Sequence, residues 1–327
     1  MKTPEIIPQH SYEIVDNINY DSAAKNVDYQ VTFRITEFCN IHCDYCHWND
    51  GKHYNIEDIK KGLDKLDEFF LIQKFNKVLF YFHGGEPMTH PDIIEIIKYI
   101  KNMETETIIE MQTNLTCKQD ILSLMLNDVD MLSISYHYIE LMKTNHHSKF
   151  IDNYDFIKNK KHTINNFDIM LENIPGDELD HFYKVVEGFL KYDNILNSEM
   201  IYGFCHYKYN EETSKKHLAF YKKHNQTEQE YIIDGSKYTT NDLFKKGLDC
   251  RGWKCQAGNY SIVVNGDGNI FNCGIHMTNY LRGCDNKIFG NLLDDNILIK
   301  LKMLCKIGTL CRWNYCGGDF YLKKEKR

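Results

Sequence analysis

Three cysteines stand close together near the start of the chain, in the stretch TEFCNIHCDYCHW, as Cys39, Cys43 and Cys46. Their spacing is C-x3-C-x2-C. Three thiolates at this spacing can bind three irons of a cubane cluster and leave the fourth iron without a protein ligand. Such an open position can activate a small molecule, as it does in catalytic metal sites. A structural zinc site is the alternative, with His42 or His47 as the fourth ligand.

A second motif, Gly84-Gly85-Glu86-Pro87, follows the apolar run KVLFYFH. Alone it predicts only a turn, but together the two motifs, in this order, resemble the radical SAM superfamily. The resemblance implies that the three cysteines bind a 4Fe–4S cluster whose free iron holds the amino and carboxylate groups of S-adenosylmethionine (AdoMet). It also implies that the glycines and Glu86 lie at the methionine ammonium, and that reductive cleavage gives a 5′-deoxyadenosyl radical.

Composition narrows the class of protein. The chain has 327 residues, 43% of them hydrophobic, which is enough for one main domain and a smaller second one. The sequence contains neither an apolar run of about 20 residues, as a membrane span needs, nor the order of a signal peptide. Twelve cysteines in clusters favour metal ligation in a reducing cytosol over disulfides. The net charge of −7 argues against nucleic acid as a partner. We therefore expect a cytoplasmic enzyme.

An alternation of strand and helix patterns begins at residue 29 and continues to residue 224. Strands are predicted over residues 29–36, 77–82, 107–113, 131–136, 167–172 and 199–205. Helices are predicted after a cap at Asn55 and over residues 91–103, 117–127, 139–160, 177–191 and 211–224. This order predicts an α/β fold with a parallel sheet. Six units match the partial (β/α)6 TIM-like barrel of the resembled family, in which chemistry lies at the carboxyl ends of the strands.

Several polar or soft side chains fall at those strand ends. The resemblance places Tyr45 against adenine and Asn114, which follows the third strand, near the ribose. Ser135 and Met170 are further candidates for cofactor contacts. The alternative for each is structural: a core tyrosine, a turn asparagine, a hydroxyl that bonds local backbone, and a core methionine.

Three more residues are candidates for the barrel lumen. His137 alternates with Ser135 on the fourth strand and is a candidate contact of ribose or substrate. Glu172 ends an apolar strand, and because an unpaired buried carboxylate is costly, we expect it near a charged ligand. Arg34 lies on the polar face of the first strand, which faces either the lumen or water.

The last part of the chain carries a second group of cysteines. Residues 261–265 and 269–273 predict a hairpin around Gly266-Asp267-Gly268. The spacing C-x12-G-x4-C, from Cys255 to Cys273, resembles the opening of SPASM and twitch extensions. Because the later block reads C-x5-C-x4-C, one auxiliary 4Fe–4S cluster is expected rather than two. The resemblance implies the ligands Cys255, Cys273, Cys311 and Cys316, with Cys250 competing for the fourth place. A zinc ribbon with the same thiolates remains open.

These patterns divide the chain into four parts. Residues 1–28 are predicted as an N-terminal arm, residues 29–224 as the partial barrel, residues 225–249 as a polar linker, and residues 250–327 as the twitch- or SPASM-like domain.

The resemblance implies an oxidoreductase or epimerase that abstracts a hydrogen atom, with a flavodoxin- or ferredoxin-type electron donor. A peptide substrate of ribosomal-peptide maturation is the first expectation, leading to oxidation, cross-linking or epimerisation. Cys205, predicted at the end of the sixth strand, is a candidate hydrogen-atom donor. The same chemistry on a sugar, aminocyclitol or nucleotide is the first alternative. A zinc-bound interaction protein without catalytic activity is the second.

Overall fold

The structure is a computed structural model of the chain. It describes residues 12–15, 27–46, 51–190, 196–200, 211–224, 230–233, 236–239, 254–255, 261–273, 277, 288–307 and 309–310.

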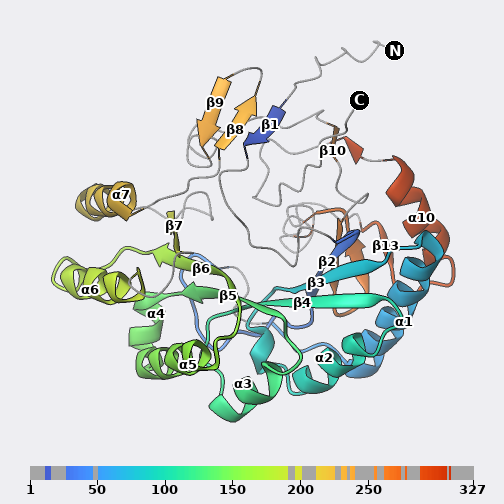
Figure 1. Cartoon of the computed structure of the whole chain (residues 1–327), viewed down its shortest axis with the longest axis horizontal. Helices are drawn as coiled ribbons and strands as arrows, with labels where there is room; N and C mark the ends of the chain where they lie inside the picture. The colour runs from blue at the N-terminus through green and yellow to red at the C-terminus, as the bar shows by residue number, and fades with distance from the viewer. Residues whose placement is uncertain are drawn as a thin grey trace.

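A nine-stranded sheet organises this part of the chain, in the order β13-β12-β11-β2-β3-β4-β5-β6-β7 (Figure 1). The strands from β11 to β7 in this order run parallel, whereas β12 and β13 are antiparallel to their neighbours. The predicted α/β fold with a parallel sheet is therefore confirmed. The strand bounds are β2 Tyr29–Arg34, β3 Lys77–Phe82, β4 Glu106–Thr113, β5 Met131–Tyr136, β6 Ile164–Leu171, β7 Leu196–Met200, β11 Ser261–Asn265, β12 Asn269–Phe271 and β13 Gly290–Asn291.

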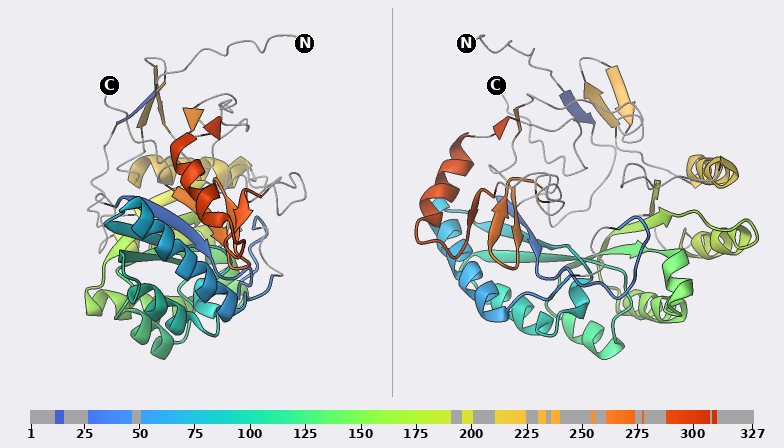
Figure 2. Two further views of the ribbon diagram at one scale, coloured as in Figure 1. Left: turned by 90° about the vertical axis from the view of Figure 1, so that its right-hand side faces the viewer. Right: turned by 180° about the vertical axis from the view of Figure 1, so that it is seen from behind.

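Helices follow one another along the outer side of the sheet, as Figure 1 and the view from behind in Figure 2 both show. Their bounds are α1 Ile56–Gln73, η2 Pro87–Thr89, α2 Ile93–Lys101, α3 Gln119–Met125, α4 Tyr138–Lys143, α5 His147–Lys160, α6 Leu179–Leu190, α7 Glu211–His224 and α10 Ile297–Ile307. The sequence predicts one helix over residues 139–160. The structure has two, because Asn145 takes a positive φ of 58° between α4 and α5.

The core lies between this outer layer and the sheet. Helix α1 begins as predicted, because Asn55 Oδ1 accepts a hydrogen bond from Glu57 N at 2.8 Å. Its buried stripe, Ile59, Leu63, Leu66 and Phe70, follows helical spacing. The opposite face of the strands, which points into the barrel lumen, carries polar residues such as Gln112 and Ser135, and also an apolar cluster of Leu79, Ile108 and Met131. Alternation along the strands therefore divides the side chains between the core and the lumen.

The C-terminal hairpin extends the barrel sheet itself. Strands β11 and β12 form the predicted hairpin, and β11 also pairs in parallel with β2, with Val264 opposite Phe33. Gly266 N donates to Arg34 O at 2.7 Å just beyond the last pair. Sequence periodicity predicts the hairpin but not its partner, because pairing between distant strands leaves no local pattern. The division of the chain at residue 249 stays a prediction.

Two smaller sheets complete the described part. Strand β1, Tyr12–Val15, pairs with β8, Glu230–Ile233, which pairs with β9, Ser236–Thr239. The sequence predicts residues 225–249 as a polar linker, but the structure has two strands within it. The Asp-Gly dipeptide between them in the sequence is a hairpin signal. Strand β10, Lys254–Cys255, pairs with β14, Thr309–Leu310. Within the described residues, no helix has both the length and the apolar character that crossing a membrane requires.

Candidate functional site

The cysteine loop lies at the carboxyl end of β2, between β2 and α1. A small buried cluster joins this loop to strand β6 across the barrel; its members are Ile41, Cys43 and Tyr45, with Cys39, Cys46 and Met170 packed against them. The structure therefore brings Met170 to the three cysteines, and its predicted contact with a cofactor stays a prediction.

The donor set of this loop fits a cubane cluster. Cys39, Cys43 and Cys46 share one small cluster of buried and partly buried residues, and each cysteine of a cubane binds a different iron. His47, one of the two alternative zinc ligands, lies outside the described residues. Burial and the nearby Glu86 carboxylate raise the pKa of the Cys39 thiol to about 12, so a bound cation is needed to hold this sulfur as a thiolate.

The Gly-Gly-Glu-Pro motif at the end of β3 contacts the backbone of the cysteine loop directly. Gly85 N donates to Thr36 O at 3.1 Å, and Glu86 N donates to Phe38 O at 2.8 Å. A Cβ on Gly85 would stand 2.0 Å from Phe38 O, and Gly84 has a φ of 138°. The two glycines thus let the two loops meet. Their predicted contact with the methionine ammonium stays a prediction.

Glu86 joins the end of β3 to the end of β4. Its buried carboxylate accepts hydrogen bonds from Met88 N at 3.0 Å, Thr113 Oγ1 at 2.9 Å and Asn114 N at 2.6 Å. Burial raises the pKa of Glu86 to about 7, although these three donors act in the opposite direction. The Glu86 carboxylate therefore links the loop after β3 to the end of β4 through hydrogen bonds.

Asn114 faces the cysteine loop. Its Nδ2 lies 3.7 Å from Cys39 Sγ and 3.0 Å from Asn40 Oδ1. The structure thus brings together two residues that the sequence singles out separately, Cys39 and Asn114. A contact of Asn114 with ribose stays a prediction.

Tyr45 and His137 meet beside Cys43. Tyr45 Oη lies 2.5 Å from His137 Nδ1, which is 3.5 Å from Cys43 Sγ. Burial lowers the pKa of His137 to about 4, so the imidazole is neutral. Burial also raises the pKa of Tyr45. His137 directly follows β5. At this end of the lumen it lies next to the cysteine loop, as its expected lumen position allows.

Glu172, two residues beyond Met170, is buried behind this group. Ile139 N, at the start of α4, donates to Glu172 Oε2 at 2.8 Å. Desolvation raises the pKa of Glu172 to about 8; Glu140 adds to the rise and Lys143 opposes it. Because its pKa lies above 7, the Glu172 carboxyl group is protonated at neutral pH. When ionised, it raises the pKa values of Cys43 and Tyr45.

A row of polar side chains crosses the lumen face below these strand ends. Tyr81 Oη donates to Gln112 Oε1 at 2.8 Å, and Gln112 Nε2 donates to Ser135 Oγ at 3.1 Å. The sequence reasoning selects Ser135 but misses Tyr81 and Gln112, although both alternate with buried strand residues. Arg34 is fully buried on the same side, and burial lowers its pKa to about 10. It therefore does not face water.

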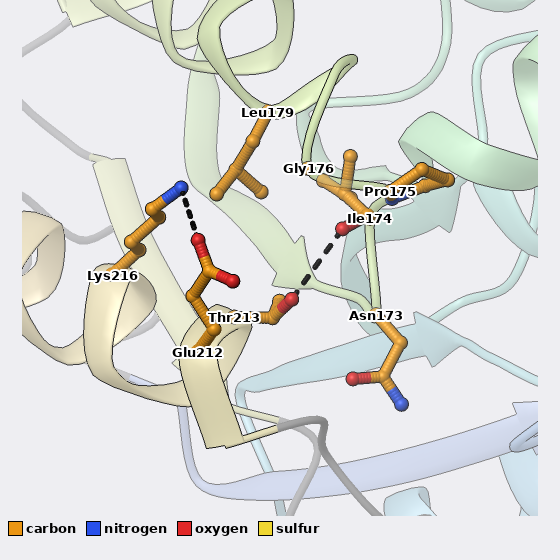
Figure 3. Close-up of a pocket in the computed structure, with 8 residues that line it drawn as sticks. All are labelled: Asn173, Ile174, Pro175, Gly176, Leu179, Glu212, Thr213 and Lys216. Atoms are coloured by element: carbon orange, nitrogen blue, oxygen red, sulfur yellow. Dashed lines mark hydrogen bonds and ion pairs between the residues drawn. The ribbon is translucent and has the colours of Figure 1, made fainter.

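A separate cavity of about 130 Å³ lies where the chain leaves β6 (Figure 3). One wall comes from the loop between β6 and α6, and the other from α7, whose Thr213 Oγ1 lies 3.5 Å from Ile174 O. Lys216 and Glu212 form an ion pair of 2.9 Å at its rim. No sequence motif indicates this cavity. Its lining is Asn173, Ile174, Pro175, Gly176, Leu179, Glu212, Thr213 and Lys216.

The second group of cysteines is only partly described. Cys255 lies in β10 opposite Thr309 of β14. Position 311 follows β14 directly in the sequence. Cys273 lies two residues after β12. Four of the predicted site residues, Cys205, Cys250, Cys311 and Cys316, lie outside the described residues. The auxiliary cluster stays a prediction.

The segment that carries these strand ends is similar in sequence to known proteins. The family model of the Radical SAM superfamily matches residues 33–185, which run from β2 into α6. GTP 3′,8-cyclase of Lactiplantibacillus plantarum is 33% identical over 98 residues, covering 29% of this chain and 29% of that protein. S-adenosylmethionine-dependent nucleotide dehydratase of Selenomonas ruminantium is 33% identical over 73 residues, covering 22% of this chain and 25% of that protein. The matched segments thus span less than a third of either relative.

Solved structures extend the likeness of fold beyond this segment. The structure of native anSMEcpe with bound AdoMet and Cp18Cys peptide aligns with a TM-score of 0.54 and 15% identity. The alignment covers 84% of this chain and 80% of that one. At this identity the likeness concerns the fold alone.

Proposed function

We propose that this chain is a radical SAM enzyme that uses AdoMet to abstract a hydrogen atom from a peptide substrate, because residues 33–185 match the family model of the Radical SAM superfamily. The observation that supports this most directly is the meeting of three strand ends at one place. The cysteine loop after β2 bonds to the glycine motif after β3, and Asn114 after β4 reaches Cys39. Parallel barrels carry their chemistry at this end.

The residues present fit the groups that this chemistry needs. Cys39, Cys43 and Cys46 would bind a 4Fe–4S cluster. When bound, this cluster and AdoMet supply a 5′-deoxyadenosyl radical by one-electron cleavage of AdoMet. The chain's own residues hold and orient the site: the glycine motif fixes the cysteine loop, and the buried Tyr45 and the partly buried Met170 cover one side of it. The row from Tyr81 to Ser135 presents polar groups to whatever lies in the lumen.

The peptide assignment follows the resemblance of the cysteine motifs to peptide-modifying radical SAM enzymes, and a solved structure that shares the fold holds a peptide. The structure bound to a peptide aligns over 84% of this chain, so its likeness continues past the family domain into the C-terminal part. Oxidation, cross-linking or epimerisation would then depend on where the substrate electron goes. An auxiliary cluster held by Cys255, Cys273, Cys311 and Cys316 would accept it, whereas a Cys205 thiol would return a hydrogen atom. A flavodoxin- or ferredoxin-type protein would supply the first electron.

A nucleotide is the second candidate substrate, because two sequence relatives bear names of nucleotide-modifying enzymes at 33% identity. Those relatives match over less than a third of their length, and the segment they share is the part that would bind the cluster and AdoMet. For this reason the peptide remains our first proposal.

One experiment tests both the cleavage of AdoMet and the class of substrate. The protein is purified and reconstituted without oxygen, and 5′-deoxyadenosine is measured after dithionite and AdoMet are added. Formation of 5′-deoxyadenosine supports the activity, and zinc in place of iron would refute it. The increase in 5′-deoxyadenosine formation is then compared between a library of short peptides and the common nucleoside triphosphates. Stimulation by nucleotides alone would replace the peptide assignment.

A further inference from the structure

Two asparagines and a threonine form a closed ring of hydrogen bonds beside the cysteine loop. Asn114 Nδ2 donates to Asn40 Oδ1 at 3.0 Å, and Asn40 Nδ2 donates to Thr116 Oγ1 at 2.7 Å. Thr116 Oγ1 closes the ring by donating to Asn114 Oδ1 at 2.6 Å. The ring joins the loop after β2 to the loop after β4.

The ring settles which end of the Asn114 amide faces Cys39. Asn114 Oδ1 accepts from both Thr116 N, at 3.1 Å, and Thr116 Oγ1, so the oxygen must point toward Thr116. Nδ2 therefore points toward the cysteine loop. Its two hydrogens go to Asn40 Oδ1 and to Cys39 Sγ, the latter at 3.7 Å. Because an amide nitrogen carries two donors, neither remains for another acceptor.

The loop that carries Asn114 is held in a strained shape. Leu115, the next residue, has a φ of 56° although its side chain is fully buried. Asn153 of α5, itself 2% exposed, donates to Leu115 O and Cys117 O at 2.9 Å each. Non-glycine residues persist in this conformation only where the surroundings enforce it, and such strain gathers at functional sites.

We propose that Asn114 is a positioning residue that donates a hydrogen bond to the sulfur of Cys39 and thereby raises the reduction potential of the cluster bound there. A hydrogen bond to a cluster sulfur stabilises the more negative, reduced state, and such bonds are among the factors that set cluster potentials. The inference rests on the proposed function, since it needs a cluster at Cys39. It replaces the ribose contact that the sequence suggests for Asn114.

The test compares the midpoint potential of the cluster, measured by redox titration with electron paramagnetic resonance, in reconstituted full-length variants. Asn114→Leu removes the donor to Cys39. Thr116→Val removes the ring bond that orients this donor but leaves Thr116 N in place. Thr107→Val is the matched control, because the Thr107 hydroxyl bonds Ile100 O at the opposite end of the same strand.

For Asn114→Leu we expect the equilibrium constant for one-electron reduction of the cluster to fall about tenfold, which shifts the midpoint potential by about 59 mV to more negative values. Thr116→Val should shift in the same direction by less, and Thr107→Val should not shift. The dissociation constant of AdoMet should stay the same in all three variants. If Asn114→Leu does not fold, Thr116→Val together with Asn40→Ala decides the question.

An unchanged potential in the ring variants would overturn the inference, whatever happens to the affinity for AdoMet. An equal shift in Thr107→Val would overturn it as well. A weaker affinity for AdoMet with an unchanged potential would restore Asn114 as a ribose contact. Failure of the unaltered chain to assemble any iron–sulfur cluster is a different result, because it refutes the proposed function rather than the role of Asn114.

Discussion

At the scale of single residues, the site is defined by how its buried polar groups find partners. Glu86, Asn114 and Tyr45 are side chains that the sequence offers as cofactor contacts, yet each also bonds the protein around it. A buried polar group without a partner costs free energy, so a site must satisfy its own residues before a ligand arrives. The residues that hold the loops are therefore as necessary as those that would touch AdoMet.

Replacement of Cys43 by alanine tests the cluster assignment. Cys43→Ala removes one of three thiolates, so we expect loss of the iron and acid-labile sulfide of this one cluster, with the share of the proposed auxiliary cluster retained, and no formation of 5′-deoxyadenosine. Cys117→Ala is the control, because the Cys117 side chain packs against the main core and not in the cysteine loop. Iron analysis after anaerobic reconstitution gives the comparison, and equal iron in both variants would contradict the assignment.

Glu172 should make stability depend on pH. Its pKa is raised from 4.5 to about 8 by burial. Between these values the unfolded chain is ionised while the native carboxyl stays protonated, so the native state binds more protons. The free energy of unfolding should therefore fall as the pH rises from about 4.5 to about 8. Replacement by glutamine removes this fall. The free energy of unfolding of Glu172→Gln, relative to that of the unaltered chain, should therefore rise from pH 5 to pH 8 by on the order of a few kcal/mol.

Urea denaturation at pH 5 and pH 8 measures that gain. Glu68→Gln, on the exposed side of α1, is the control that removes a carboxylate in contact with water. We expect Glu68→Gln to follow the unaltered chain at both pH values. The same difference between Glu172→Gln and the unaltered chain at both pH values would show that burial does not hold this carboxyl protonated.

At the scale of elements, the site depends on loops that can approach one another closely. The loop after β2 and the motif after β3 share backbone hydrogen bonds, and the glycines make room for them. Amphipathic helices such as α1 pack against the outer face of the sheet and hold the strands in place. Loop contacts of this kind position the thiols more directly than the helices do.

Gly85→Ala should separate these two loops. A Cβ there would stand 2.0 Å from Phe38 O, which is backbone and has little freedom to move. We expect a loss of about 1–3 kcal/mol in the free energy of unfolding, typical of overpacking, and weaker binding of AdoMet to the reconstituted protein. Gly188→Ala is the control within α6, where a Cβ meets nothing within 4 Å.

The control should have the opposite sign. Alanine is favoured over glycine inside a helix by about 0.5–1 kcal/mol, so Gly188→Ala should be slightly more stable than the unaltered chain. Chemical denaturation of all three proteins gives the comparison. A Gly85→Ala protein as stable as the unaltered chain would mean that the two loops do not meet as described.

At the scale of the whole molecule, distant parts of the chain share one sheet. Strand β11 follows β2 by more than two hundred positions in the numbering, yet the two strands pair along their whole common length, from Ser261 opposite Gln30 to Asn265 opposite Arg34. The strand that leads into the cysteine loop is therefore covered on one edge by the C-terminal part. This pairing makes the barrel and the hairpin depend on each other.

A fragment of residues 1–249 tests that dependence. Removal of β11 leaves the edge of β2 unpaired and exposes apolar surface beneath Ile262 and Val264, so we expect association of the fragment and a lower free energy of unfolding. Size-exclusion chromatography and chemical denaturation measure the two effects. A monomeric, cooperatively folded fragment would instead support an independent barrel, with the division that the sequence predicts at residue 249.

The sequence by itself determined the chemistry and the order of elements. The C-x3-C-x2-C and GGEP motifs, and strand bounds such as Lys77–Phe82, can be read from it because ligand spacing and alternation are local properties of a chain. Only the tertiary structure decided which strand ends meet: that Asn114 faces Cys39, that His137 lies between Tyr45 and Cys43, and that β11 pairs with β2. These contacts join residues far apart in sequence, so their geometry arises from packing and leaves no periodic trace.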